Sequence, residues 1–380
     1  MKSALFSFNN LQFIKHPKSD ELIDSEAQLI LGFGAKKIFE SSDIFRQLKS
    51  KYPKAEIALC STAGEIYDAE VMDNSVSISV MQFAKTKIKT ATVQITDFEN
   101  STEAGIALVK KLDFNQLTHV LILSDGGLVN GSQLVEGINS IVQHKIPITG
   151  GLAGDGKDFN YTLVGCNAAP SKGVIAAIGF YGDDIKIAHG TLGGWEMFGT
   201  EKVITQSINN KLSEIDNSSA LDLYKTYLGK YADELPGSAL LFPLSVTLPN
   251  TDVPVVRTIL SIDNEAKTMT FAGDVPIGSK VRFMKANFDK LVEAASTAAL
   301  QSLKPTDTSK PKVALLISCV GRKLILDNRI DEEVEAVKDI FGDNTLLTGF
   351  YSYGEISPFN ENVNCSLHNQ TMTITTINEQ

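Results

Sequence analysis

The sequence has few of the residues that mark several common classes of protein. Its four cysteines are widely separated and form no Cys-x-x-Cys pair, so neither a zinc knuckle nor a dithiol redox motif is predicted. No apolar run approaches the roughly 18 residues that a membrane-spanning helix requires. The opening residues, MKSALFSFNN, lack the apolar core of a signal peptide. We therefore expect a cytoplasmic protein with reduced thiols and no membrane insertion.

Positive charge is also scarce. The chain has 35 Lys and Arg against 45 Asp and Glu, a formal net charge of −10 at pH 7, and no basic stripe. This balance argues against a partner rich in phosphate, such as a nucleic acid. The five histidines do not occur at the spacing of metal ligands, so no metal centre is predicted. With 380 residues, of which 43% are hydrophobic, the chain is long enough for two domains or one duplicated fold.

What the sequence does contain is a repeat. An apolar, strand-like segment leads into Gly-Glu-Ile twice, in CSTAGEI at 60–66 and in YSYGEIS at 351–357. Each copy follows another strand that ends in glycine, about one strand–helix–strand unit earlier. A third, looser copy lies between residues 121 and 151. The pattern predicts internal duplication, and we expect Glu65 and Glu355 to face one shared cleft at the strand ends.

The apolar periodicity predicts an α/β fold of two duplicated halves, with mixed sheets packed on one another and helices outside. Asn100 and Glu103 form a capping box at the start of a predicted helix. The runs 76–83 and 87–95 have no helical segment between them and predict a hairpin. The three runs within 162–190 predict an antiparallel meander.

Polar residues at the strand ends are the candidate site. Glu65 and Glu355 can bind a cationic group, act as an acid–base pair, or cap loop amides. Arg322 can bind a ligand carboxylate or neutralise Glu355. The GGLAGDG run at 150–156 precedes a strand rather than a helix, so it predicts a tight turn, and Asp155 there can still reach a ligand. The candidate ligand-binding residues are Ser61, Thr62, Gly64, Glu65, Gly150, Gly151, Asp155, Arg322, Ser352, Tyr353, Gly354 and Glu355.

Several motifs taken in order carry a family resemblance. They are CSTAGEI, GGLAGDG, the His189-Gly190 strand end, the Asp216…Ala220…Tyr224 pattern, the CVGR run ending at Arg322, YSYGEISP, and the Asn369–Thr371 approach to the last strand. This set resembles the FIST sensory proteins of bacteria. The resemblance assigns residues 25–215 to a FIST N-like module, 216–365 to a FIST C-like module, and 366–380 to a closing strand.

The resemblance implies a sensory protein that binds a small molecule, with amino acids as suggested ligands, and that signals to a partner such as a histidine kinase. Some stand-alone members are haem proteins that sense nitric oxide. The histidine expected before a Pro-Leu pair in such proteins is replaced here by Phe242. An axial haem ligand would then have to be His189 or another side chain.

Three functions therefore remain open. The first is a small-molecule receptor with its ligand between the two halves, the second is a haem-based nitric oxide sensor, and the third is a hydrolase that uses the paired carboxylates. No nucleophile–base pair can be assembled from the spacing of the residues, so we expect a binding protein rather than an enzyme.

Overall fold

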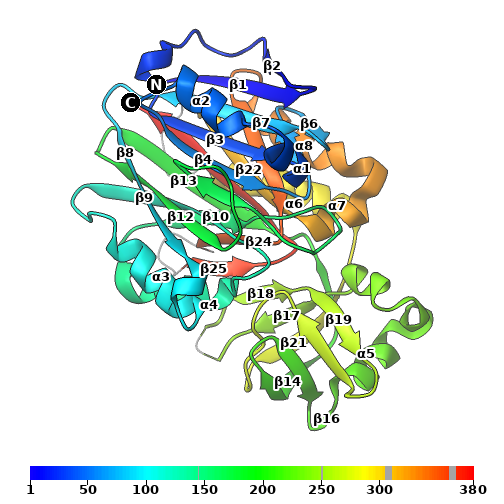
Figure 1. Cartoon of the computed structure of the whole chain (residues 1–380). Helices are drawn as coiled ribbons and strands as arrows, with labels where there is room; N and C mark the ends of the chain where they lie inside the picture. Colours follow the sequence, from blue (N-terminus) through cyan, green and yellow to red (C-terminus); the bar gives the residue numbers. More distant parts are fainter. Residues whose placement is uncertain (144, 250, 304–309, 359–364) are drawn as a thin grey trace.

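The computed structural model describes residues 1–143, 145–249, 251–303, 310–358 and 365–380. A larger body built on three mixed sheets carries a small, mostly β domain formed by residues 196–285, which lies below the body in Figure 1. The two ends of the chain meet on the far side of the body. There the amino group of Met1 lies 3.4 Å from Oε2 of Glu379.

Each of the three body sheets contains six strands. The first has the spatial order β11 (Val164–Cys166), β4 (Glu56–Ser61), β3 (Leu29–Gly34), β7 (Val76–Gln82), β1 (Lys2–Asn9), β2 (Gln12–Lys15). The second has the order β25 (Cys365–His368), β24 (Gly354–Pro358), β10 (Ile148–Leu152), β9 (Leu117–Ser124), β12 (Val174–Tyr181), β8 (Lys87–Gln94). The third has the order β13 (Ile185–Leu192), β26 (Met372–Glu379), β22 (Val313–Cys319), β23 (Leu346–Ser352), β5 (Glu65–Tyr67), β6 (Glu70–Met72).

The three sheets share one plan. Each has a central parallel pair, β3–β4, β9–β10 or β22–β23. An antiparallel strand, β7, β12 or β26, lies next to the first strand of the pair, and a further antiparallel strand, β1, β8 or β13, lies beyond it. A short antiparallel strand, β11, β24 or β5, lies next to the second strand of the pair. That short strand is exchanged cyclically between units, because the chain leaves β4 for β5 in the third sheet, β10 for β11 in the first, and β23 for β24 in the second. The predicted duplication thus extends to the looser copy at 121–151, and the three units interlock.

The central strands are continuous apolar runs because both of their faces are buried. In β9, Leu121 and Leu123 enter a core shared by all three sheets, whereas Val120 and Ile122 face the helices outside. Within the shared core the rings of Phe33 and Phe350 stack with centroids 4.8 Å apart. The three sheets are therefore held around one apolar centre.

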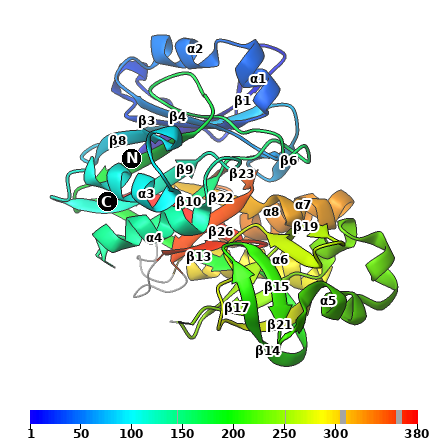
Figure 2. The same ribbon diagram turned by 60° about the horizontal axis from the view of Figure 1, so that its bottom comes forward.

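Helices cover the outer face of each sheet, and Figure 2 shows the three sets on separate sides of the body. The first sheet carries α1 (Lys36–Ser41) and α2 (Ile44–Lys51). The second carries α3 (Ser101–Lys110) and α4 (Gly131–Val142). The third carries α6 (Phe288–Gln301), α7 (Val320–Leu326) and α8 (Ile330–Phe341). None of the helices in the described part of the chain is long and apolar enough to cross a membrane.

The small domain has a sheet and an apolar core of its own. Its strands are β14 (Glu196–Ile208), β15 (Lys211–Ile215), β16 (Ser218–Ser219), β17 (Leu244–Thr247), β18 (Pro254–Arg257), β19 (Ile259–Asp263), β20 (Thr268–Phe271) and β21 (Lys280–Lys285), and its α-helix is α5 (Ala220–Leu228). The predicted module boundary at 215/216 falls between β15 and β16, which pair with each other. The small domain thus contains residues from both predicted modules.

The predicted fold class and helix cap are confirmed, whereas two predicted strand pairings are wrong. The α/β class, the mixed sheets and the outer helices are confirmed, and the Asn100 side chain caps α3 by accepting from the amide of Glu103. The hairpin over 76–95 is wrong, because β7 joins the first sheet and β8 the second. The meander over 162–190 is also wrong, because its three strands enter three different sheets. Consecutive strands lie in different sheets here because β8 and β13 each begin a new unit and because β11 is the strand that the second unit contributes to the first sheet.

Candidate functional site

The carboxyl ends of the three parallel pairs hold the chemistry-bearing residues. In each pair the last residues are in register, Gly34 with Ser61, Ser124 with Leu152, and Cys319 with Ser352. A helix or loop follows the first strand of each pair, and an acidic residue follows the second. Ligands in α/β proteins commonly bind just beyond the carboxyl ends of strands.

The two repeated glutamates make the same set of contacts. Glu65 accepts from the Thr62 hydroxyl at 2.6 Å and from the amide and hydroxyl of Ser75, which directly precedes β7. Glu355 accepts from the Ser352 hydroxyl at 2.6 Å and from the amide and hydroxyl of Thr371, which directly precedes β26. Each carboxyl therefore ties the end of one strand to the start of another within its own unit.

Both glutamates are buried. Burial raises the pKa of Glu65 to about 7, although the hydrogen bonds from Thr62 and Ser75 oppose the shift. Burial likewise raises the pKa of Glu355 to about 8 against the bonds from Ser352 and Thr371. Of the two carboxyls, that of Glu65 lines a charged cavity described below, whereas Glu355 is not among the described residues that line it or the interdomain cavity.

The remaining unit, that of β9 and β10, divides this task between two aspartates. Asp125 receives the amide of Gly173, next to the start of β12, on Oδ2 at 2.8 Å. Asp155, the acidic residue beyond β10, does not make this contact to the start of a strand and has other partners. It forms an ion pair with Lys36 at 2.9 Å, accepts from the amides of Asn160 and Tyr161, and accepts from the Tyr353 hydroxyl. Although burial acts to raise it, these hydrogen bonds hold the pKa of Asp155 below its ordinary value.

The guanidinium of Arg322 is bound by other groups of the protein. It is fully buried, forms an ion pair with Glu333 at 2.7 Å, and donates to the carbonyls of Gly193 and Leu291. Glu333 also accepts from the hydroxyls of Ser318 and Tyr351. Arg322 is not among the described residues that line the two cavities introduced below. Its guanidinium instead links α7, α8 and the Gly193 loop.

Other predicted positions also have structural partners. The Ser61 hydroxyl accepts from the amide of Leu163 at 2.8 Å. Gly150, at φ +152°, leaves no room for a side chain, because a Cβ there would lie 2.0 Å from the Ile122 carbonyl oxygen. Gly151 and Gly354 have close neighbours across the β10–β24 pair. These residues shape the strand ends without themselves facing an open cavity.

A charged cavity of about 430 Å³ brings part of the predicted site together. From the candidate list it gathers Thr62, Gly64, Glu65 and Asp155. The remaining charges are supplied by Lys36, Lys37, Asp73, Lys157, Asp158 and Lys323. The ammonium of Lys323 is bound by the carboxylate of Asp73 and the carbonyl of Ala63, so much of this charge is paired internally.

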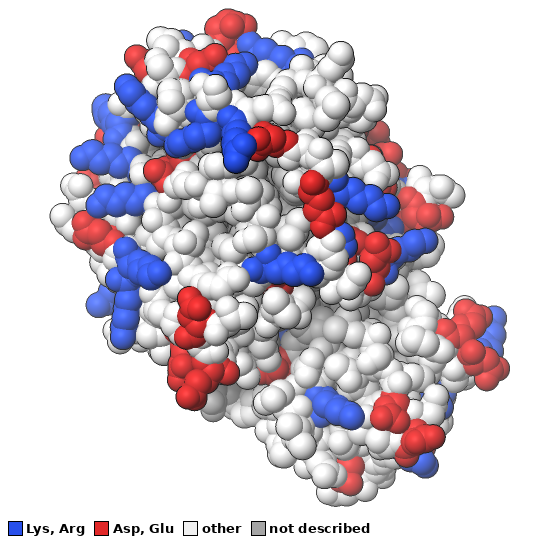
Figure 3. Space-filling view, in the orientation of Figure 1, with Lys and Arg blue, Asp and Glu red and all other residues white. Residues whose placement is uncertain are grey.

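A second cavity, of about 390 Å³, lies between the body and the small domain and is lined by residues of both. We call it the interdomain cavity, and the surface in Figure 3 is hollowed where the two parts meet. The body contributes the segment before α4, the loop 159–162, the start of α7, Tyr353 and Asn369. The small domain contributes Asn210, Thr258, Leu260 and the segment 271–274. Of the predicted residues, Tyr353 is the one that lines this cavity.

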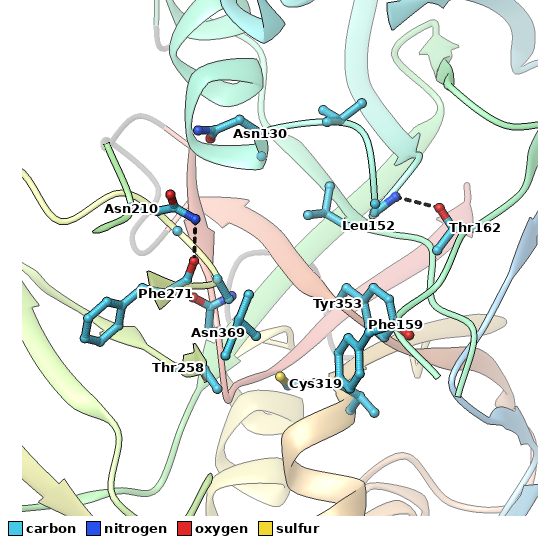
Figure 4. A pocket seen from close by; sticks show the side chains of 18 of the residues that line it. Asn130, Leu152, Phe159, Thr162, Asn210, Thr258, Phe271, Cys319, Tyr353 and Asn369 are labelled. Carbon is cyan, nitrogen blue, oxygen red and sulfur yellow. Dashed lines mark hydrogen bonds between the residues drawn. The ribbon is translucent and has the colours of Figure 1, made fainter. Parts of the chain in front are cut away.

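Figure 4 shows how these side chains lie. Tyr353 and Phe159 stack on one side, with ring centroids 4.6 Å apart and planes at 17°. Asn369, Thr258 and Phe271 lie on the other side. The Tyr353 hydroxyl reaches out to Asp155, so the aromatic wall of the interdomain cavity is anchored to the charged cavity behind it. The two cavities therefore share one partition.

Asn369 lines the interdomain cavity but is not among the ligand-binding residues predicted from the sequence. Its side chain is fully buried, and neither Oδ1 nor Nδ2 has a hydrogen-bond partner among the described residues. The Thr258 hydroxyl, on the facing domain, is also buried and without a partner there. Leaving such a group unpaired costs about 1–3 kcal/mol, so each of these groups needs a partner that is not among the described residues, such as an ordered water, an ion or a ligand. The sequence signal was the Asn369–Thr371 segment, which entered only as part of the family resemblance.

The interdomain cavity offers little for catalysis or for haem. Burial keeps the pKa of the Cys319 thiol well above its ordinary value, so the thiol that lines the cavity stays protonated. No histidine lies among the described residues that line either cavity, and His189 lies on β13 away from both. The described lining of these two cavities therefore offers no histidine to the iron of a haem.

Comparison with known proteins agrees with the ordered motifs. A family model described as the FIST N domain matches residues 28–218, and one described as the FIST C domain matches residues 220–358. No curated protein matches the sequence significantly. Among solved structures, similarity is found to a chorismatase (9% identity over 99% of this chain and 98% of that one, TM-score 0.34) and to a cyanuric acid hydrolase (10% identity over 100% and 99%, TM-score 0.34).

Because the two family models between them cover most of the chain, it belongs to the FIST family, whose domains are sensory domains of signal transduction proteins.

Proposed function

We propose that this chain is a receptor whose small-molecule ligand occupies the interdomain cavity, and that the ligand sets how the small domain lies on the body. The observation that carries the proposal is the buried, unpartnered amide of Asn369 beside a cavity of about 390 Å³. Cavities of this size, mostly apolar with a few polar groups, are typical of small-molecule sites.

The position of the cavity supports a signalling role. Its lining comes from both family modules, with Asn130 and Tyr161 in the FIST N match and Thr258 and Tyr353 in the FIST C match. A ligand that touches both the body and the small domain favours the placement in which both contacts form. A signalling partner such as a histidine kinase would then read that placement from the outer surface of the small domain.

The partners that the strand-end residues already have within the protein argue against an amino acid bound at the strand ends. Arg322 and Glu355 would be needed to bind the carboxylate and ammonium of an amino acid, yet each already has protein partners. The proposal therefore moves the ligand away from the Glu65–Glu355 axis. It also makes the protein a binder rather than a hydrolase, because both glutamates are engaged in strand-end contacts and the Cys319 thiol is protonated.

Thermal-shift screening of the full chain against a mixed metabolite panel tests the proposal. A ligand at 100 times its dissociation constant adds about 2.7 kcal/mol to the stability of the protein. We expect at least one compound to stabilise the wild type and Glu65→Gln but not Asn369→Leu. Stabilisation that survives in Asn369→Leu, or is lost in Glu65→Gln, would place the ligand elsewhere.

A further inference from the structure

The interdomain cavity carries information about the chemistry of its ligand. The chemical class of this ligand, inferred below, rests on the proposed function. It follows from the charge, the shape and the hydrogen-bonding groups of the cavity lining. Each can be read separately from the described residues that line the cavity.

The lining argues against an anionic ligand. Among its described residues there is no lysine or arginine, and the single ionisable carboxylate is that of Asp274. That carboxylate accepts from the Asn130 side-chain amide at 3.0 Å, in front of α4. A carboxylate or phosphate bound here would lose its hydration without gaining a lysine or arginine partner among the described lining residues, and burial of an unpaired charge is strongly unfavourable. At the start of α4, Asn130 caps the amide of Gln133 and the Asp274 carboxylate already lies against it.

The walls suit a flat molecule. Phe159 and Tyr353 present a stacked aromatic pair, and Leu128, Leu260 and Phe271 add apolar surface. Rings prefer to pack on aromatic faces in offset or edge contacts. At about 390 Å³ the cavity lies near the lower end of the range for ligand pockets, so it admits a compact ring system rather than an extended chain.

The Asn369 amide supplies the hydrogen-bonding edge. A carboxamide presents an acceptor and a donor side by side, and here both are buried without a partner. A ligand edge with an adjacent donor and acceptor pairs with it through two hydrogen bonds, as asparagine does with the edge of an adenine base. The unpaired Thr258 hydroxyl, from the facing domain, can bond a further polar atom of the same ligand.

We infer that the interdomain cavity binds an uncharged, planar heterocycle or aromatic amide whose edge carries adjacent N–H and C=O groups, paired with the side-chain amide of Asn369. Uracil-like lactams and primary aromatic amides both have this edge. A hydrogen bond from the Thr258 hydroxyl, which belongs to the small domain, to a ligand held by Asn369 would couple ligand binding to the position of the small domain.

Four defined probes test this inference by isothermal titration of the full chain. Uracil and 1,3-dimethyluracil differ in the N–H donors, and nicotinamide and nicotinate differ in the charge of one substituent. We expect uracil and nicotinamide to bind, and their methylated or anionic counterparts to bind about tenfold more weakly or worse. Asn369→Leu should lose the uracil and nicotinamide binding, while Glu65→Gln, outside the cavity, should retain it.

The outcomes separate the inference from the proposed function. If neither uracil nor nicotinamide binds but a charged compound from the metabolite panel does, and Asn369→Leu abolishes that binding, the ligand class is wrong and the receptor site stands. If nicotinate binds as tightly as nicotinamide, the argument from charge is wrong. If Asn369→Leu leaves all binding unchanged, or nothing in either set binds, the site itself is refuted.

Discussion

Replacing Asn369 with leucine should make the free protein more stable while removing its ligand site. The side-chain oxygen and nitrogen of Asn369 are buried without partners in the described structure. Leucine has a similar shape and no polar atom, so the substitution removes two uncompensated desolvation costs and leaves the backbone of the loop unchanged.

The structure gives the expected magnitude. Each unpaired buried group costs about 1–3 kcal/mol, and the branched methyl groups of leucine offset part of the gain because they fit the site imperfectly. A rise of about 1–3 kcal/mol in the free energy of unfolding is therefore expected for Asn369→Leu. The wild type regains the difference when ligand is bound, since at 100 times the dissociation constant binding contributes about 2.7 kcal/mol.

Asn210 provides a matched control in the same cavity. Its Nδ2 donates to the carbonyl of Phe271 at 2.7 Å. Asn210→Leu should lower the free energy of unfolding by about 0.5–1.5 kcal/mol, the net contribution of one hydrogen bond, or more if the Phe271 carbonyl stays buried and unpaired. The same chemical change thus has opposite expected signs at two positions of one cavity.

Differential scanning calorimetry of the wild type and the two leucine variants, without added ligand, measures both effects. The melting temperature should rise for Asn369→Leu and fall for Asn210→Leu. A fall of similar size for both variants would mean that the Asn369 amide is hydrogen-bonded in solution, through an ordered water for example, and the reasoning that assigns it to a ligand would be refuted.

Three further predictions concern the strand ends. Because the pKa values of Glu65 and Glu355 are raised to about 7 and about 8 from 4.5, their contribution to stability is complete below pH 4.5 and is lost as the pH rises toward 8. The double variant Glu65→Gln/Glu355→Gln should flatten the profile of melting temperature between pH 5 and 8, and an unchanged slope would contradict these shifts. Asp155→Asn should speed hydrogen–deuterium exchange of the amides of residues 160 and 161, because the carboxylate that accepts from both also carries the ion pair to Lys36; exchange as slow as in the wild type would show that the loop is held otherwise. Arg322→Ala should destabilise the protein by about 3–5 kcal/mol in urea unfolding, because it leaves the carboxylate of its ion-pair partner buried and unpaired, whereas a stable variant would return Arg322 to the list of candidate ligand contacts.

Local sequence signals gave reliable local structure. The Asn100 cap could be predicted because its acceptor and the amide of Glu103 are three residues apart in the chain. The apolar runs at 29–34, 121–124 and 315–319 could be recognised as buried strands for the same reason, since burial on both faces leaves no polar alternation. Even the repeat was visible, because each copy keeps a strand end, a small residue and an acidic residue within a few positions.

Pairing across the chain could not be predicted in this way. The runs 76–83 and 87–95 are adjacent in sequence and suggest a hairpin, yet they belong to different sheets. The boundary between the first and second units falls between them, so β7 pairs within the first sheet and β8 within the second. The cyclic exchange of β5, β11 and β24 among the three units then interlocks sheets that each bury one apolar face in a single core. No pattern within one segment records that exchange.

The sequence by itself determined the α/β class, the repeated strand ends and the family, because these depend on residues that are neighbours in the chain. Only the tertiary structure decided which polar groups are already satisfied. Glu355 and Arg322 read as ligand contacts until Thr371 and Glu333 are seen to occupy them. Asn369 gained its importance for the converse reason, since a buried amide is notable only when the folded chain is found to offer it no partner.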